Sequence, residues 1–104
     1  MEEREKARPE GNRAEEANST EIPLPEVTFA TFILSLNTSA LVHLGELPEP
    51  GKDEPEMDLA LARHAIDTIA MLKEKTRGNL SKDEEALVDN ILFDLRMKFV
   101  QKTG

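Results

Sequence analysis

The feature that most restricts the fold is an uncharged run from Val27 to Gly45. Its nineteen residues, VTFATFILSLNTSALVHLG, include no Asp, Glu, Lys or Arg, although these four types make up 33% of the chain. Wound into a helix, the run would be apolar over about 200° of its circumference, roughly twice the width that an ordinary surface helix buries. Such a helix must be covered by lipid, by the protein's own core or by a partner. We expect core and partner together.

The composition narrows the class of protein. The 104 residues suffice for one domain. Because the chain contains no cysteine, it can form neither a disulfide nor a thiolate metal site, which fits a reducing cytoplasm. Charged residues begin at Glu2 without an apolar signal core, so we do not expect export. The formal net charge is -8 and no basic face is visible, so we expect no nucleic-acid partner.

The chain divides into a tail and a helical domain. Residues 1–25 are rich in Glu, Arg, Asn and Ala, contain three prolines and hold almost no apolar residue before Ile22. They are therefore predicted to be a disordered acidic tail. Residues 26–102 contain the periodic apolar segments and are predicted to form the domain. Pro25 prevents the residue before it from being helical, which places the start of the first helix at Glu26.

The helical domain is predicted to be all-α, with a long apolar helix, an acidic proline-rich loop and a helical hairpin. Apolar residues recur with helical periodicity over three segments. These segments cover about residues 26–44, 57–76 and 81–102. Gly45 suits the left-handed position after the first helix, and three prolines exclude regular structure from residues 46–56. After a turn at Gly78, the spacing of Ser81 and Glu84 is that of a capping box that starts the third helix.

The third helix carries two apolar faces on opposite sides. One face consists of Leu87, Val88, Ile91, Leu92, Leu95 and Phe99. The opposite face consists of Ala86, Phe93, Met97 and Val100, which a single copy of three helices leaves uncovered. Leaving about 400 Å² of apolar surface in water forfeits on the order of 10 kcal/mol. We therefore expect oligomerisation to complete the fold, with a two-fold dimer favoured and Phe93, Met97 and Val100 in the interface.

The first helix offers further candidates for the interface. The spacing of Thr31, Ser35 and Ser39 is the small-xxx-small pattern that lets another helix approach closely. A Ser/Thr face turned to solvent is the alternative. Asn37 lies within the apolar arc, and Asn against Asn across a dimer can fix its register. A hydrogen bond to a loop carbonyl, or a water-lined gap, is the other explanation for this residue.

Two functions other than self-association stay open. As a helix, residues 27–45 would reach about 28 Å, close to the hydrocarbon thickness of a bilayer. A membrane-associated protein anchored by this segment is therefore one alternative, although its acidic flanks provide no Lys or Arg as an anchor. A small metal- or ligand-binding helical protein that uses His43 or His64 is the other, although neither residue belongs to a two-ligand helical spacing. We expect no enzyme, no cofactor and no catalytic or metal site, because no convergent polar constellation is visible.

Three phrases of the sequence resemble a known family. They are FATFILSLNTSALVHLGE (Phe29 to Glu46), DLALARHAIDTIAMLKEKTRGNL (Asp58 to Leu80) and DLRMKFV (Asp94 to Val100). Together they resemble a bacterial family catalogued as domain of unknown function 1844, over residues 27–101. The resemblance implies a small, mostly helical bacterial protein. It implies no activity, ligand or catalytic residue.

These observations predict a non-catalytic function. We expect a small cytoplasmic assembly or adaptor module that associates with itself, with an unidentified protein as a further partner and without membrane contact. The residues assigned to the oligomer interface are Thr31, Ser35, Asn37, Ser39, Phe93, Met97 and Val100.

Overall fold

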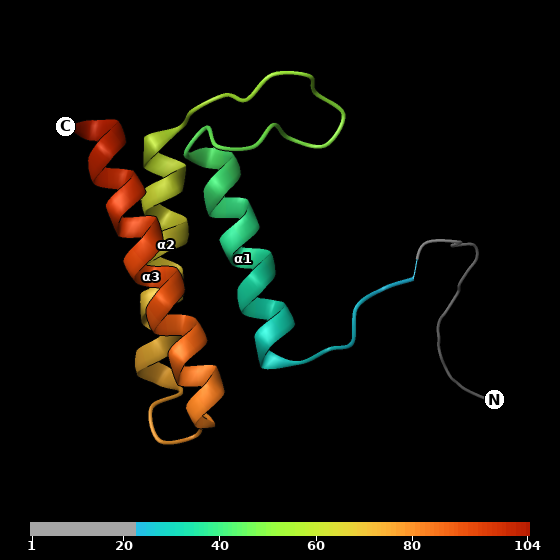
Figure 1. Ribbon diagram of the computed structural model, residues 1–104, viewed down its shortest axis with the longest axis vertical. Coiled ribbons are helices and arrows are strands. Elements are labelled where there is room, and N and C mark those ends of the chain that lie inside the picture. The colour runs from blue at the N-terminus through green and yellow to red at the C-terminus, as the bar shows by residue number, and fades with distance from the viewer. Residues whose placement is uncertain (1–22) are drawn as a thin grey trace.

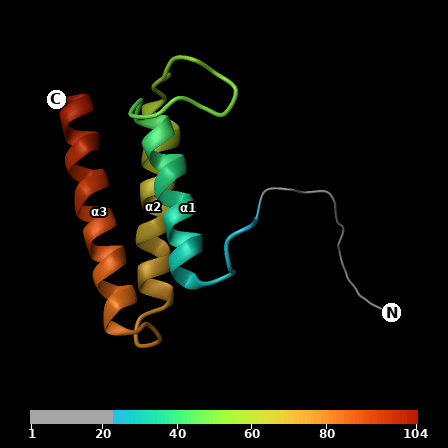
Figure 2. The same cartoon turned by 45° about the vertical axis from the view of Figure 1, so that its right-hand side comes forward.

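The computed structural model describes residues 23–104. Within this range the chain forms a bundle of α1 (Phe29–His43), α2 (Leu59–Lys75) and α3 (Lys82–Thr103). Each helix runs antiparallel to the one before it (Figure 1 and Figure 2). Residues of all three pairs of helices are in contact. The predicted all-α class is thereby confirmed. The tail predicted over residues 1–25 lies, except for its last three residues, outside the described range.

Helix α1 begins three residues later than predicted, at Phe29 instead of Glu26. The Thr28 hydroxyl accepts a hydrogen bond from the N–H of Thr31 at 3.0 Å, and the N–H of Thr28 donates to the Thr31 hydroxyl at 3.1 Å. This reciprocal capping box satisfies the free N–H groups of a helix start, which fixes the start at this point. Helix α1 therefore has 15 residues, fewer than the nineteen of the uncharged run. In the described part of the chain, no helix reaches the length and hydropathy that a membrane span requires.

The connection between α1 and α2 is a loop whose two ends are held together. After α1, Gly45 takes a φ of 81°, the left-handed conformation expected for it. The N–H of Glu46 then bonds to the carbonyl of Leu41 at 2.9 Å, which completes a Schellman motif. Leu44 forms an isolated antiparallel bridge with Met57, so the loop leaves and rejoins the bundle at one place.

Polar side chains fix the start of the other two helices. The Asp58 carboxylate accepts a hydrogen bond from the N–H of Leu61 at 3.1 Å and caps α2. The predicted capping box of α3 is confirmed, because the N–H of Glu84 donates to the Ser81 hydroxyl at 3.1 Å and the N–H of Ser81 donates to the Glu84 carboxylate at 2.8 Å. Between these helices Gly78 has a φ of 86°, which lets the chain reverse.

The core lies between the three helices. Ile33 of α1, Ile69 of α2 and Leu95 of α3 are completely covered, at 0% exposure. The buried apolar side chains are Ile33, Ala40, Leu44, Ala62, Ala65, Ile66, Ile69, Val88, Ile91, Leu92 and Leu95. An ion pair of 3.1 Å between Lys102 and Glu46 joins the end of α3 to the loop after α1. The apolar face of α3 that contains Leu95 is thus used for the core, and its second face is left outside.

Candidate interaction surface

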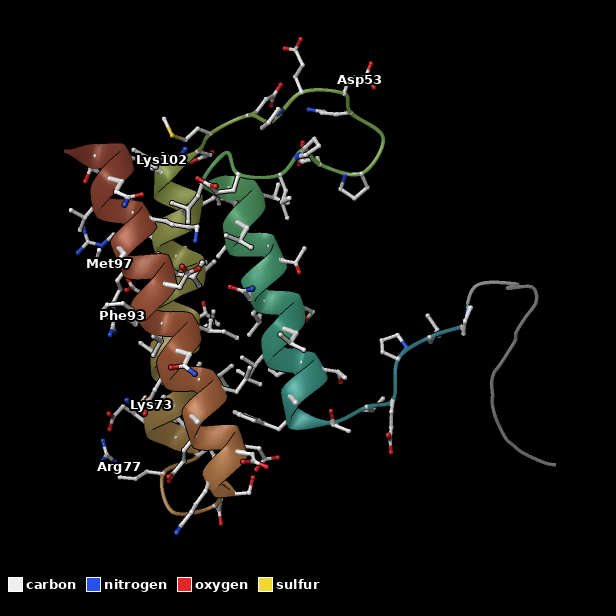
Figure 3. The ribbon with its side chains drawn as sticks, in the orientation of Figure 1. Asp53, Lys73, Arg77, Phe93, Met97 and Lys102 are labelled. Carbon is white, nitrogen blue, oxygen red and sulfur yellow. The ribbon has the colours of Figure 1, made fainter. Side chains whose placement is uncertain are left out.

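The outer side of α3 gathers large apolar side chains that the bundle does not cover. Phe93, Met97 and Val100 are 69%, 49% and 63% exposed. Because they are spaced four and three residues apart, they lie along one side of the helix. Phe93 and Met97 are on the side turned away from α1 (Figure 3). The exposed Phe32 and Leu34 of α1 are only two residues apart and so lie on different sides of that helix, where they form no row.

Two smaller residues extend this row toward the start of α3. We define the α3 seam as Ala86, Asn90, Phe93, Met97 and Val100, all of which are exposed. Their alternating spacing of four and three residues is that of a coiled-coil contact line. At 1.5 Å per residue the seam is about 21 Å long. It contains no charged residue, which distinguishes it from the rest of the outer surface of α3.

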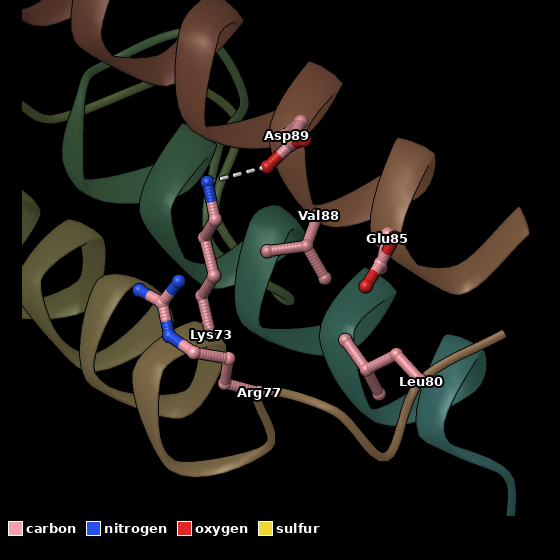
Figure 4. Close-up of a pocket in the computed structure, with 6 residues that line it drawn as sticks. All are labelled: Lys73, Arg77, Leu80, Glu85, Val88 and Asp89. Atoms are coloured by element: carbon pink, nitrogen blue, oxygen red, sulfur yellow. Dashed lines mark ion pairs between the residues drawn. The ribbon is translucent and has the colours of Figure 1, made fainter. Parts of the chain in front are cut away.

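One edge of the α3 seam is charged and borders a groove between α2 and α3. Asp89 and Arg96 lie on this edge, each directly before a seam residue. The Lys73 ammonium of α2 is 2.6 Å from the Asp89 carboxylate (Figure 4). These three residues and four apolar residues of α3 line a depression of about 390 Å³. The opposite edge carries Asp94, whose carboxylate is 2.6 Å from the Lys98 ammonium.

Two further depressions continue this groove toward its ends. One, of about 220 Å³, is lined by Lys73, Arg77, Leu80, Glu85, Val88 and Asp89. The other, of about 300 Å³, is lined by Arg63, Ile66, Asp67, Arg96, Phe99 and Val100. The Arg77 guanidinium lies 2.6 Å from the Glu74 carboxylate, and its hydrogen bond and charge lower the pKa of Glu74 below the ordinary value. Both groups of this pair are exposed, so the shift reflects a surface ion pair and not a carboxyl prepared for proton transfer.

The structure places the α1 residues assigned to the interface away from the α3 seam. Thr31 is engaged in the capping box of α1, whereas Ser35 and Ser39 are exposed. The Ser35 hydroxyl donates to the carbonyl of Phe32 at 2.7 Å, and the Ser39 hydroxyl is 3.5 Å from Nε2 of His43. Since contacts within α1 engage all three hydroxyls, none of them needs a second helix. Their place in an interface stays a prediction.

Asn37 is partly buried on α1. Its Oδ1 atom is covered by the protein and has no hydrogen-bond partner within residues 23–104. A single copy therefore already shields this oxygen from solvent, at the cost of leaving it unsatisfied. The hypothesis that Asn37 fixes the register of a dimer stays a prediction.

The two histidines lie on different helices. His43 is the last residue of α1 and is partly buried, and His64 is exposed on α2. Over residues 23–104, no three His, Asp or Glu side chains come together in a group that could hold a metal ion.

The interface residues assigned from the sequence do not include the charged edge of this surface. Asp89 and Arg96 stand directly before Asn90 and Met97, so the helical periodicity alone places them on one flank of the second apolar face of α3. The ion pair of Asp89 with Lys73 had no such signal, because it joins two helices whose rotation about their axes is set only by packing.

Comparison with known families identifies the chain. The family model described as Domain of unknown function (DUF1844) matches residues 26–101, a range that includes the core and the whole α3 seam. The comparisons with curated proteins and with solved structures gave no match. The family resemblance seen in the sequence is thus confirmed. Because the match covers well over half of the chain, this protein belongs to the family described as Domain of unknown function (DUF1844).

Proposed function

We propose that this protein is a non-catalytic, cytoplasmic assembly module that forms a homodimer through the α3 seam. The observation that carries the proposal is the exposure of Phe93, Met97 and Val100 in one uncharged row. Single apolar side chains on a surface are ordinary, whereas a contiguous row of large ones marks a contact site. A second copy presents the same row, so two copies cover each other without any other partner.

The energetics favour a dimer of low affinity. Complete burial of a Val, Met or Phe side chain contributes about 1.5–3 kcal/mol. Phe93, Met97 and Val100 are each about half exposed or more, so we take about half of that value for each. A symmetric dimer buries these three side chains from each copy, which contributes about 5–9 kcal/mol in total. Because association costs at least about 4 kcal/mol, no more than about 5 kcal/mol remains, which corresponds to a dissociation constant of hundreds of micromolar or weaker.

The groove beside the seam supports a non-catalytic role. Four of the charged groups in and beside this groove are engaged in pairs, Lys73 with Asp89 and Arg77 with Glu74. A general acid or base needs a carboxyl, imidazole or amine whose pKa is tuned by its surroundings, and the pairs in this groove are exposed. The cysteine-free composition supports the cytoplasm as the compartment. Cell fractionation tests that assignment, and recovery of the protein in the membrane pellet would contradict it.

Sedimentation equilibrium of the full chain tests the dimer. We expect a monomer–dimer equilibrium in the range of hundreds of micromolar to millimolar. We expect the double variant Phe93→Ser/Met97→Ser to be a monomer with the circular dichroism of the wild type. Phe32→Ser is the matched control, because it removes a half-exposed Phe from α1. It should leave the dimer unchanged. A wild-type chain that stays monomeric at millimolar concentration, or a double variant that still dimerises, would refute the proposal.

A further inference from the structure

We infer that the two copies pair their α3 helices antiparallel, with the two-fold axis beside Phe93. This inference rests on the proposed dimer and adds its orientation and register. In such a pair, residues that lie equally far before and after Phe93 come opposite each other. Ala86 lies seven residues before Phe93 and Val100 seven residues after it, so the axis at Phe93 uses the entire seam.

The distribution of side-chain size along the seam favours this axis. The half before Phe93 holds the small residues Ala86 and Asn90, and the half after it holds the larger Met97 and Val100. Antiparallel pairing lays the large half of one copy on the small half of the other, and places Phe93 against Phe93 of the second copy. Large side chains then enter spaces left by small ones, as close packing requires.

The charged edge of the seam is self-complementary in this orientation. In an antiparallel pair related by a two-fold axis, the same edge of both helices meets. Asp89 lies four residues before Phe93 and Arg96 three residues after it, so Arg96 of each copy comes beside Asp89 of the other. Arg96 has no ion pair within residues 23–104. The depression that Asp89 lines, of about 390 Å³, leaves room for a guanidinium next to this carboxylate.

The parallel orientation lacks this complementarity. In a parallel pair the edge with Asp89 and Arg96 would meet the opposite edge, which carries Asp94 and Gln101. Asp89 would then face Asp94 of the second copy, a contact between like charges, and Arg96 would face the uncharged Gln101. Charge at the edges of a helix pair sets its orientation, and here it selects the antiparallel one.

Disulfide trapping in the full chain tests the orientation, and the absence of native cysteine gives a clean background. Under mild oxidation, an equimolar mixture of Ala86→Cys and Val100→Cys should form a crosslinked dimer, whereas each variant alone should not. Both positions are exposed, so neither change disturbs the core. Crosslinking of either variant with itself would show a parallel pair and overturn the inference.

Charge reversal provides the second test. Arg96→Glu alone and Asp89→Lys alone should each weaken the dimer by about tenfold, because both place like charges together twice. Their mixture should restore it to within about threefold of the wild type, since each reversed residue meets its opposite. Lys73→Gln is the control, because it removes the ion pair of Asp89 within one copy and leaves the seam unchanged.

The two experiments separate failure of the inference from failure of the proposed dimer. A parallel pair would be strengthened by Asp89→Lys, because the new lysine would face Asp94. That result overturns the orientation and retains the dimer. A wild-type dimer that shows neither trapping nor any response to charge reversal places its interface elsewhere and also overturns the inference. A monomeric wild type overturns the dimer and the orientation together.

Discussion

Replacing Asn37 by Leu should stabilise the protein. Oδ1 of Asn37 is covered and lacks a hydrogen-bond partner within the described residues, so folding removes it from water without compensation. The cost of such a group is about 1–3 kcal/mol. Leu has the same branching and number of side-chain heavy atoms as Asn, so it fits the same space without a polar atom. We expect the free energy of unfolding to rise by about 1–3 kcal/mol, and the melting temperature by about 4–8 °C for each kcal/mol.

Urea denaturation followed by far-UV circular dichroism measures this change. The comparison must be made at one protein concentration, because dimerisation adds to the apparent stability. Thr38→Leu is the matched control, because Thr38 is the exposed neighbour of Asn37 on the same helix. It should change the stability by less than about 0.5 kcal/mol. Equal or lower stability of Asn37→Leu would refute the reasoning from the unsatisfied oxygen.

The same variant separates two explanations of the dimer. If the α3 seam forms the interface, Asn37→Leu leaves the dissociation constant unchanged, because Asn37 lies on α1. If Asn37 instead fixes the register through contact with a second Asn37, the variant is stabilised but loses its single oligomeric state. Sedimentation equilibrium distinguishes these results.

Three other substitutions test how the bundle is held together. Ile69→Ala should lower the free energy of unfolding by about 2–5 kcal/mol, because the side chain is completely covered. Met71→Ala on the same helix should lower it by less than about 1 kcal/mol, because Met71 is exposed. Equal losses in urea denaturation would mean that Ile69 is not in the core. Gly45→Ala should lower the free energy of unfolding by about 1–2 kcal/mol, because Gly45 has a φ of 81°. Gly51→Ala should lower it by no more than this, because Gly51 has a φ of 85° and no atom within contact distance of an added Cβ. A Gly45→Ala variant with unchanged thermal unfolding would contradict the Schellman geometry. Thr28→Ala should lower the free energy of unfolding by about 0.5–2 kcal/mol, because it removes the cap of α1. We expect faster amide hydrogen exchange confined to the first turn of α1, and unchanged exchange there would contradict the role of the cap.

Local signals made most of the helical architecture predictable from the sequence. Ser81 and Glu84 carry a reciprocal capping box in their side chains, and Gly45 is the residue that most readily takes a positive φ. Both features depend on neighbours in the chain, so no knowledge of packing was needed. The start of α1 was missed because the usual capping-box pattern has Glu or Gln three residues after the cap. Here Thr31 occupies that position and satisfies the same N–H groups.

Packing between helices limited the prediction of the surface. A helical-wheel plot of α3 separates its two apolar faces, so Phe93 and Met97 were assigned to the outside from the sequence alone. Such a plot gives the direction of side chains around one helix, but it does not give the position of that helix relative to another. Ser35 of α1 and Phe93 of α3 were therefore assigned to one interface, although Phe93 lies on the side of α3 that is turned away from α1. The ion pair of Lys73 with Asp89 depends on the same relative placement and left no trace in the sequence.

The loop after α1, whose two ends lie side by side, is a suitable place to insert a foreign segment. Residues 46–58 are exposed, and the bridge between Leu44 and Met57 brings the two ends of the loop together. Doubling the length of a closed flexible loop costs only about 0.6 kcal/mol. An epitope or a fluorescent reporter inserted beside Gly51 should therefore leave the stability of the helical bundle almost unchanged. The proposed dimer would then display two copies of the inserted segment.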